Sequence, residues 1–73
     1  MNKHWVIMGN YGNYGPALVC VLPLGCSHQE AGAILHRMTT APTDVDRLIM
    51  KDTTELWLEC VKTEDAWWLE NCN

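Results

Sequence analysis

The chain has 73 residues, a hydrophobic fraction of 48% and a net charge of −4, from nine acidic side chains against five Lys and Arg. This length predicts a single small domain over residues 1–73, and the composition is too apolar for a disordered chain. An acidic chain with few, scattered bases is unsuited to binding nucleic acid, and no segment reaches the roughly 18 consecutive apolar residues of a membrane-spanning helix.

The first third of the sequence predicts a β-hairpin. Residues 5–8 (Trp-Val-Ile-Met) are apolar and predict one strand, and residues 17–22, rich in Val and bounded by prolines, predict a second. Between them, residues 10–15 repeat Asn-Tyr-Gly twice, and Asn and Gly tolerate the positive φ of tight turns. Both faces of the second strand are apolar, so we expect it to be covered on both sides.

One amphipathic helix is predicted after this hairpin. Ser27 and Glu30 form an S-x-x-E capping box, in which each residue satisfies a backbone N–H group of the other. Four apolar residues then follow at helical spacing on one face: Ala31, Ile34, Leu35 and Met38. Pro42 stops the helix. A lone amphipathic helix needs a sheet on which to bury its apolar face.

The last third predicts three more strands, joined by two hairpins after a linker over residues 39–44. Pairing residues 47–51 with residues 55–59 places Lys51 opposite Glu55 and Arg47 opposite Glu59, and such opposite charges stabilise a strand pair. A second hairpin, with its loop at residues 62–65, then places Glu59 opposite Trp68. In this register both hairpins agree on which face is apolar.

These elements predict an α+β domain with a single antiparallel-rich sheet, in the order β-β-α-β-β-β, and one helix packed on one face. A β-grasp-like arrangement with fewer terminal strands is the alternative. The sheet residues expected under the helix are Leu56, Leu58, Cys60, Trp67 and Leu69.

The opposite face of the last three strands is the candidate functional site. It combines two tryptophans with charged neighbours, a composition typical of protein interfaces. The expected partner-binding residues are Ile49, Glu55, Trp57, Glu59, Trp68 and Glu70. Two alternatives remain open: a homodimer in which this face stacks on its copy, and cover of the face by another part of the same chain.

Four cysteines and three histidines raise the question of a metal or thiol site. Because no C-x-x-C or H-x-x-x-H spacing occurs, and Cys20 and Cys60 fall in apolar strands, we expect reduced thiols and no metal or other cofactor. Cys26 and His28 are close at the helix start, but no third catalytic group is identifiable, so we expect no enzymatic activity. A small-ligand or metal module using the glycine-rich loop and the Cys26/His28 corner is the second hypothesis.

The sequence therefore predicts a non-enzymatic protein-binding module. A small acidic chain without a catalytic constellation is typical of an inhibitor or adaptor, including the kind that phages direct against host protein complexes. We expect a cytoplasmic location. Residues 24–26 (Leu-Gly-Cys) resemble the end of a lipoprotein cleavage box, but Pro23 and the polar residues 10–15 interrupt the apolar region that a signal peptide requires.

Overall fold

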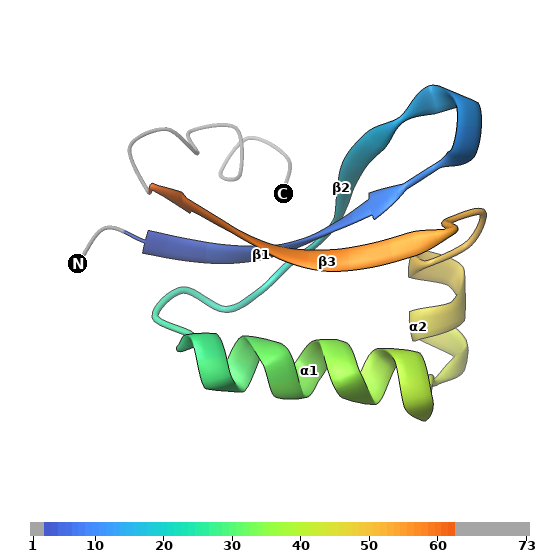
Figure 1. Cartoon of the computed structure of the whole chain (residues 1–73). Coiled ribbons are helices and arrows are strands. Elements are labelled where there is room, and N and C mark those ends of the chain that lie inside the picture. Colours follow the sequence, from blue (N-terminus) through green and yellow to red (C-terminus); the bar gives the residue numbers. More distant parts are fainter. Residues whose placement is uncertain (1–2, 63–73) are drawn as a thin grey trace.

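The computed structural model describes residues 3–62, and within them the fold is α+β, with one antiparallel sheet and two helices on the same side of it (Figure 1). The elements are β1 (Lys3–Asn10), the 3-10 turn η1 (Gly12–Tyr14), β2 (Pro16–Val21), α1 (His28–Thr40), α2 (Asp44–Ile49) and β3 (Glu55–Lys62). The described strands lie in the order β2-β1-β3. The predicted fold class is thus confirmed, whereas the order of elements matches only loosely.

The expected hairpin joins β1 and β2. Its loop contains η1, and Gly12 and Gly15 there adopt φ values of 66° and 80°, which L side chains rarely adopt. The register shifts between Ile7 and Met8, so that Val19 is an extra residue in β2. This β-bulge lets consecutive residues of β2 contribute to the same apolar core.

The strand that is buried on both faces is β1 and not β2. Val6 and Ile7, whose side chains point to opposite faces of β1, are 1% and 0% exposed. In contrast, Pro16 and Ala17 at the start of β2 are exposed. The expectation that β2 is covered on both sides is wrong, because β1 takes the central position and leaves β2 at an edge of the described sheet.

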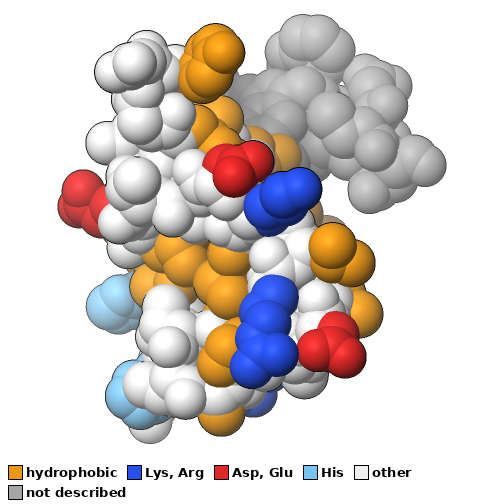
Figure 2. All heavy atoms as spheres, turned by 90° about the vertical axis from the view of Figure 1, so that its right-hand side faces the viewer, with side chains coloured by type: hydrophobic (Ala, Val, Ile, Leu, Met, Phe, Trp, Pro, Cys, Tyr) orange, Lys and Arg blue, Asp and Glu red, His pale blue; other side chains and the backbone are white. Residues whose placement is uncertain are grey.

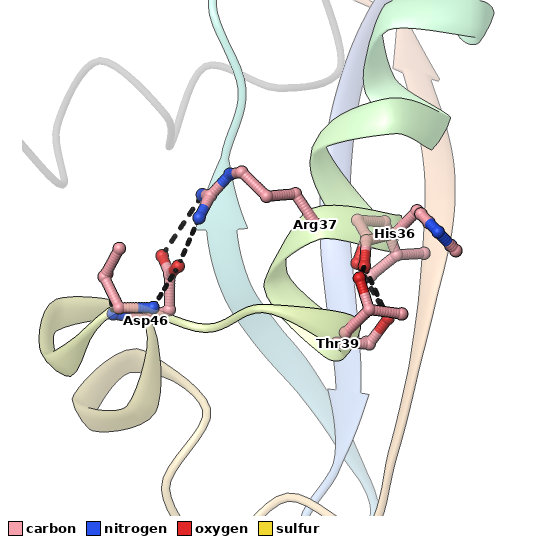
Figure 3. Close-up of polar contacts among 7 residues, drawn as sticks. His36, Arg37, Thr39 and Asp46 are labelled. Carbon is pink, nitrogen blue, oxygen red and sulfur yellow. Dashed lines mark hydrogen bonds and ion pairs between the residues drawn. The ribbon is translucent and has the colours of Figure 1, made fainter.

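The capping box at the start of α1 is confirmed. The N–H of Glu30 donates to Ser27 Oγ, and the N–H of Ser27 donates to Glu30 Oε1, both at 3.1 Å. At the other end, the Thr39 hydroxyl donates to the carbonyls of Leu35 and His36 at 3.1 and 3.0 Å (Figure 3). The capping box satisfies N–H groups that a helix leaves without intrahelical partners at its start, whereas the Thr39 hydroxyl bonds back to carbonyls of the preceding turn. Two apolar residues of α1, Ala31 and Met38, are buried against the sheet.

The segment expected to form the third strand is instead α2 and the turn after it. Thr43 is the N-cap of this helix: the N–H of Asp46 donates to Thr43 Oγ1 at 3.1 Å, and the N–H of Thr43 donates to Asp46 Oδ2 at 3.0 Å. In this second capping box, the N-cap Thr43 lies only two residues after Ala41, the C-cap of α1.

Asp46 also links the two helices. Arg37 Nη1 of α1 donates to Asp46 Oδ2 at 2.7 Å, and Nη2 lies 3.5 Å from Oδ1 (Figure 3). The Asp46 side chain is only 9% exposed. Because charge-assisted bonds to Arg are among the stronger hydrogen bonds, this pair fixes the position of α2 against α1.

β3 pairs along its whole length with β1, from Lys62 opposite Lys3 to Glu55 opposite Asn10. The predicted pairings of Glu55 with Lys51 and of Glu59 with Arg47 are therefore wrong. Leu56 and Leu58 pack in the core under the helices as expected, and Cys60 is exposed. The predicted last hairpin, with Trp67 and Leu69 under the helix, lies outside the described residues.

Candidate protein-binding face

The candidate site is the face of the sheet opposite α1 and α2, called the outer face below. Successive side chains of a strand point to opposite faces, and Ile7, Leu56 and Leu58 belong to the core on the helix side, so their neighbours in β1 and β3 point outward. The outer face comprises His4, Val6 and Met8 of β1, Leu18 and Val21 of β2, and Glu55, Trp57, Glu59 and Val61 of β3.

Trp57 lies in the middle of β3 on this face. It is paired with Met8 of the central strand, and its side chain is half-buried. Met8 packs in turn against Val6, which anchors a second apolar cluster distinct from the core under the helices. The outer face therefore has an apolar centre to which all three described strands contribute.

Two carboxylates border Trp57 along β3. Glu55 and Glu59 lie two residues before and after it, so all three side chains project from the same face. Both glutamates are exposed, and opposite them in β1 are Asn10 and Val6. Since neither pairing neutralises a carboxylate, the edge of the outer face along β3 is negatively charged.

Among the other expected site residues, Ile49 is the one that the structure describes, and it lies elsewhere. Ile49 is the last residue of α2 and packs in the core on the helix side, because residues 47–51 do not form a strand. Trp68 and Glu70 lie outside the described residues. Val6 and Met8 were not among the residues expected on this face, although the alternation of His4, Val6 and Met8 with Trp5 and Ile7 is a signal for it.

The corner at the start of α1 is held by aromatic stacking. The rings of Trp5 and His28 are stacked, with centroids 4.8 Å apart and an interplanar angle of 28°. His4 Nε2 lies 2.8 Å from the carbonyl oxygen of Leu22. Within residues 3–62, no three His, Cys, Asp or Glu side chains gather closely enough to hold a metal ion.

The cysteines of the described residues are free thiols. Burial, and to a smaller degree the negative charge of Asp46, raises the pKa of the Cys20 thiol. A raised pKa keeps this thiol protonated and poorly nucleophilic. Cys26 Sγ lies 3.6 Å from the carbonyl oxygen of Ser27 and packs beside the core. This placement is that of a small apolar core residue.

No family model matches the chain, and no curated protein or solved structure matches it either. In the part of the chain that the structure describes, both helices are too short and too polar to cross a membrane. Function is therefore inferred from the outer face itself.

Proposed function

We propose that this chain is a non-enzymatic protein-binding module that docks through the outer face. The observation that carries the proposal is Trp57, an indole that stands opposite Met8 on the side of the sheet that neither α1 nor α2 covers. Trp and Met are enriched at protein interfaces, and truncating a central Trp commonly costs binding about 2 kcal/mol or more.

The charges suggest the chemistry of the partner. Glu55 and Glu59 flank the indole and the whole chain carries a net charge of −4, so the complementary surface is an apolar pocket with a basic rim. Rim charges of this kind mainly raise the association rate and make it sensitive to salt. We place such a module in the cytoplasm as an inhibitor or adaptor of a protein complex, including a complex that a phage targets in its host.

The test is affinity capture from lysate of the source cells, with the bound protein then purified and titrated against variants. Trp57→Ala is expected to weaken binding of that protein by about tenfold or more. The matched control is Tyr14→Ala, which removes an aromatic side chain that is 94% exposed in the hairpin loop and belongs to none of the strands that form the outer face. Circular dichroism reports whether each variant keeps its helices.

Charge reversal then tests the rim. Glu55→Lys together with Glu59→Lys is expected to slow association and to remove most of its salt dependence, with a smaller effect on dissociation. A captured partner that binds the Trp57→Ala variant as tightly as the wild type, while Tyr14→Ala weakens binding, would show that the docking surface is elsewhere.

A further inference from the structure

An unpaired hydrogen-bond acceptor lies at the end of the central strand, beside the outer face. Asn10 is the last residue of β1 and continues the outward alternation of Val6 and Met8. Its backbone carbonyl accepts from both the N–H and the hydroxyl of Thr54, at 2.8 and 3.2 Å. In contrast, its side-chain Oδ1 is buried and has no donor among the described residues. Because a buried acceptor without a donor is unfavourable, this amide gains from a donor that a ligand supplies.

Glu55 lies directly across the strand pair from this amide. The two residues are partners in the pairing of β1 with β3, so their side chains leave the same face of the sheet, with Cβ atoms about 5 Å apart. Figure 2 looks onto the end of the molecule that carries α2 and shows acidic side chains both beside basic ones and apart from them. Both ion pairs of the described residues lie in the helices, so the exposed Glu55 carboxylate belongs to neither.

Trp57 adds an aromatic surface next to these acceptors. It lies two residues after Glu55 in β3, about 7 Å along the strand, and its indole is half-buried on the outer face. It is also a diagonal neighbour of Asn10, since its own partner in β1 is Met8. The face of an indole attracts a cation, and a planar guanidinium stacks on it with less loss of hydration than an ammonium group.

We propose that Asn10, Glu55 and Trp57 form a binding site for one arginine side chain of the partner. The guanidinium stacks on the indole, donates two parallel N–H groups to the carboxylate, and donates a further N–H to Asn10 Oδ1, which turns outward by rotation about the soft χ2 torsion. Arginine fits this set because its N–H donors lie in one plane and reach acceptors on two strands, whereas lysine is a single point of charge. This inference rests on the proposed function and specifies the basic residue that the partner brings.

Nuclear magnetic resonance titration of the full chain with two capped tripeptides, Gly-Arg-Gly and Gly-Lys-Gly, tests the site without the natural partner. The arginine peptide is expected to shift the amide signals of Asn10 and Glu55 and the indole N–H signal of Trp57, with a dissociation constant on the order of 10 mM. The lysine peptide is expected to bind at least about threefold more weakly. Trp57→Leu is expected to remove this difference between the two peptides.

Two pairs of variants separate the contributions of the acceptors. Asn10→Ala is expected to reduce the preference for arginine to less than about twofold, whereas Asn10→Asp, which keeps an acceptor, retains it. The matched control is Asn13→Ala, which changes the exposed Asn of the second Asn-Tyr-Gly repeat in the hairpin loop. Glu55→Gln is expected to weaken both peptides about threefold or more, and Asp44→Asn, which removes the same charge from an exposed side chain of α2, to leave both unchanged. The dispersion of the amide signals shows whether each variant is folded.

Equal affinity of the wild type for the two peptides would overturn the arginine site, and so would a folded Asn10→Ala variant with the full preference for arginine. Failure of this site is distinguishable from failure of the proposed function. A captured partner that loses binding in Trp57→Ala, while the chain ignores the arginine peptide, leaves the docking face in place and removes the arginine. An arginine peptide that binds as expected, with a captured partner that tolerates Trp57→Ala, supports the site and removes the docking proposal.

Discussion

Among the five glycines of the chain, Gly9 in the central strand is the one whose surroundings leave least room for a side chain. A Cβ atom there would lie 2.7 Å from Val19 Cγ2, 3.0 Å from Thr53 Cγ2 and 3.1 Å from Leu56 Cδ2. The two closest neighbours, Val19 and Thr53, belong to different segments, and because χ1 rotation of Val and Thr is restricted, neither side chain can move aside cheaply. Overpacking of this kind costs about 1–3 kcal/mol, and we expect Gly9→Ala to lower the free energy of unfolding by that amount.

Gly32 provides the matched control. It lies within α1, and apart from its chain neighbours and the backbone of the helix itself, no heavy atom comes within 4 Å of a Cβ built on it. Gly32→Ala is therefore expected to stabilise the protein by about 0.5–1 kcal/mol, from helix propensity and the reduced entropy of the unfolded chain. Urea unfolding followed by circular dichroism measures the change in unfolding free energy of both variants. If Gly9→Ala is as stable as the wild type, the close contact between β1, β2 and the turn before β3 is not as described.

Two further predictions concern single residues. The pKa of Asp46 is lowered from 3.8 to about 2, mainly by the hydrogen bond from Arg37 and to a smaller degree by the bond from the N–H of Thr43. The ionised carboxylate therefore stabilises the fold above pH 3.8, and this contribution is lost as the pH falls towards 2. Melting temperatures between pH 4 and pH 2 should fall more steeply for the wild type than for Asp46→Asn, and equal slopes would contradict the ion pair. Asp52 has a φ of 69°, a left-handed conformation that Gly adopts without the strain a Cβ atom causes. The free energy of unfolding of the Asp52→Gly variant should therefore be about 1 kcal/mol higher than that of Asp52→Ala, and equal urea midpoints for the two variants would refute this.

The parts of the fold that depend on local chemistry were predicted from the sequence. The Ser27/Glu30 capping box, the end of α1 before Pro42 and the glycine turn between β1 and β2 all depend on residues within a few positions of one another. The outward direction of Trp57 follows from alternation within β3 in the same way. What these signals leave undetermined is which strands pair, because pairing joins residues distant in the sequence.

The prediction of a strand over residues 47–51 was wrong because its charge pattern is compatible with a helix as well as with a hairpin. Lys51 and Glu55 suit a hairpin, but Thr43 and Asp46 form a T-x-x-D capping box after Pro42, and that signal for a helix was missed. A cross-strand ion pair contributes only about 0.2–1 kcal/mol, whereas losing an N-cap commonly costs about 1 kcal/mol. The capping signal should therefore have been given more weight than the charges, and Ile49 would then have been left out of the site.

The central place of β1 has a consequence for how the chain matures. β1 is the earliest strand to be synthesised, yet one of its two hydrogen-bonding edges is filled by β3, which begins 45 residues after β1 ends (Glu55 against Asn10). Until that late segment leaves the ribosome, the nascent hairpin displays an unpaired edge beside the apolar Val6 and Ile7. Such edges recruit other chains, so a product terminated before Glu55 is expected to aggregate during translation, whereas the longer product can pair this edge of β1 with its own β3.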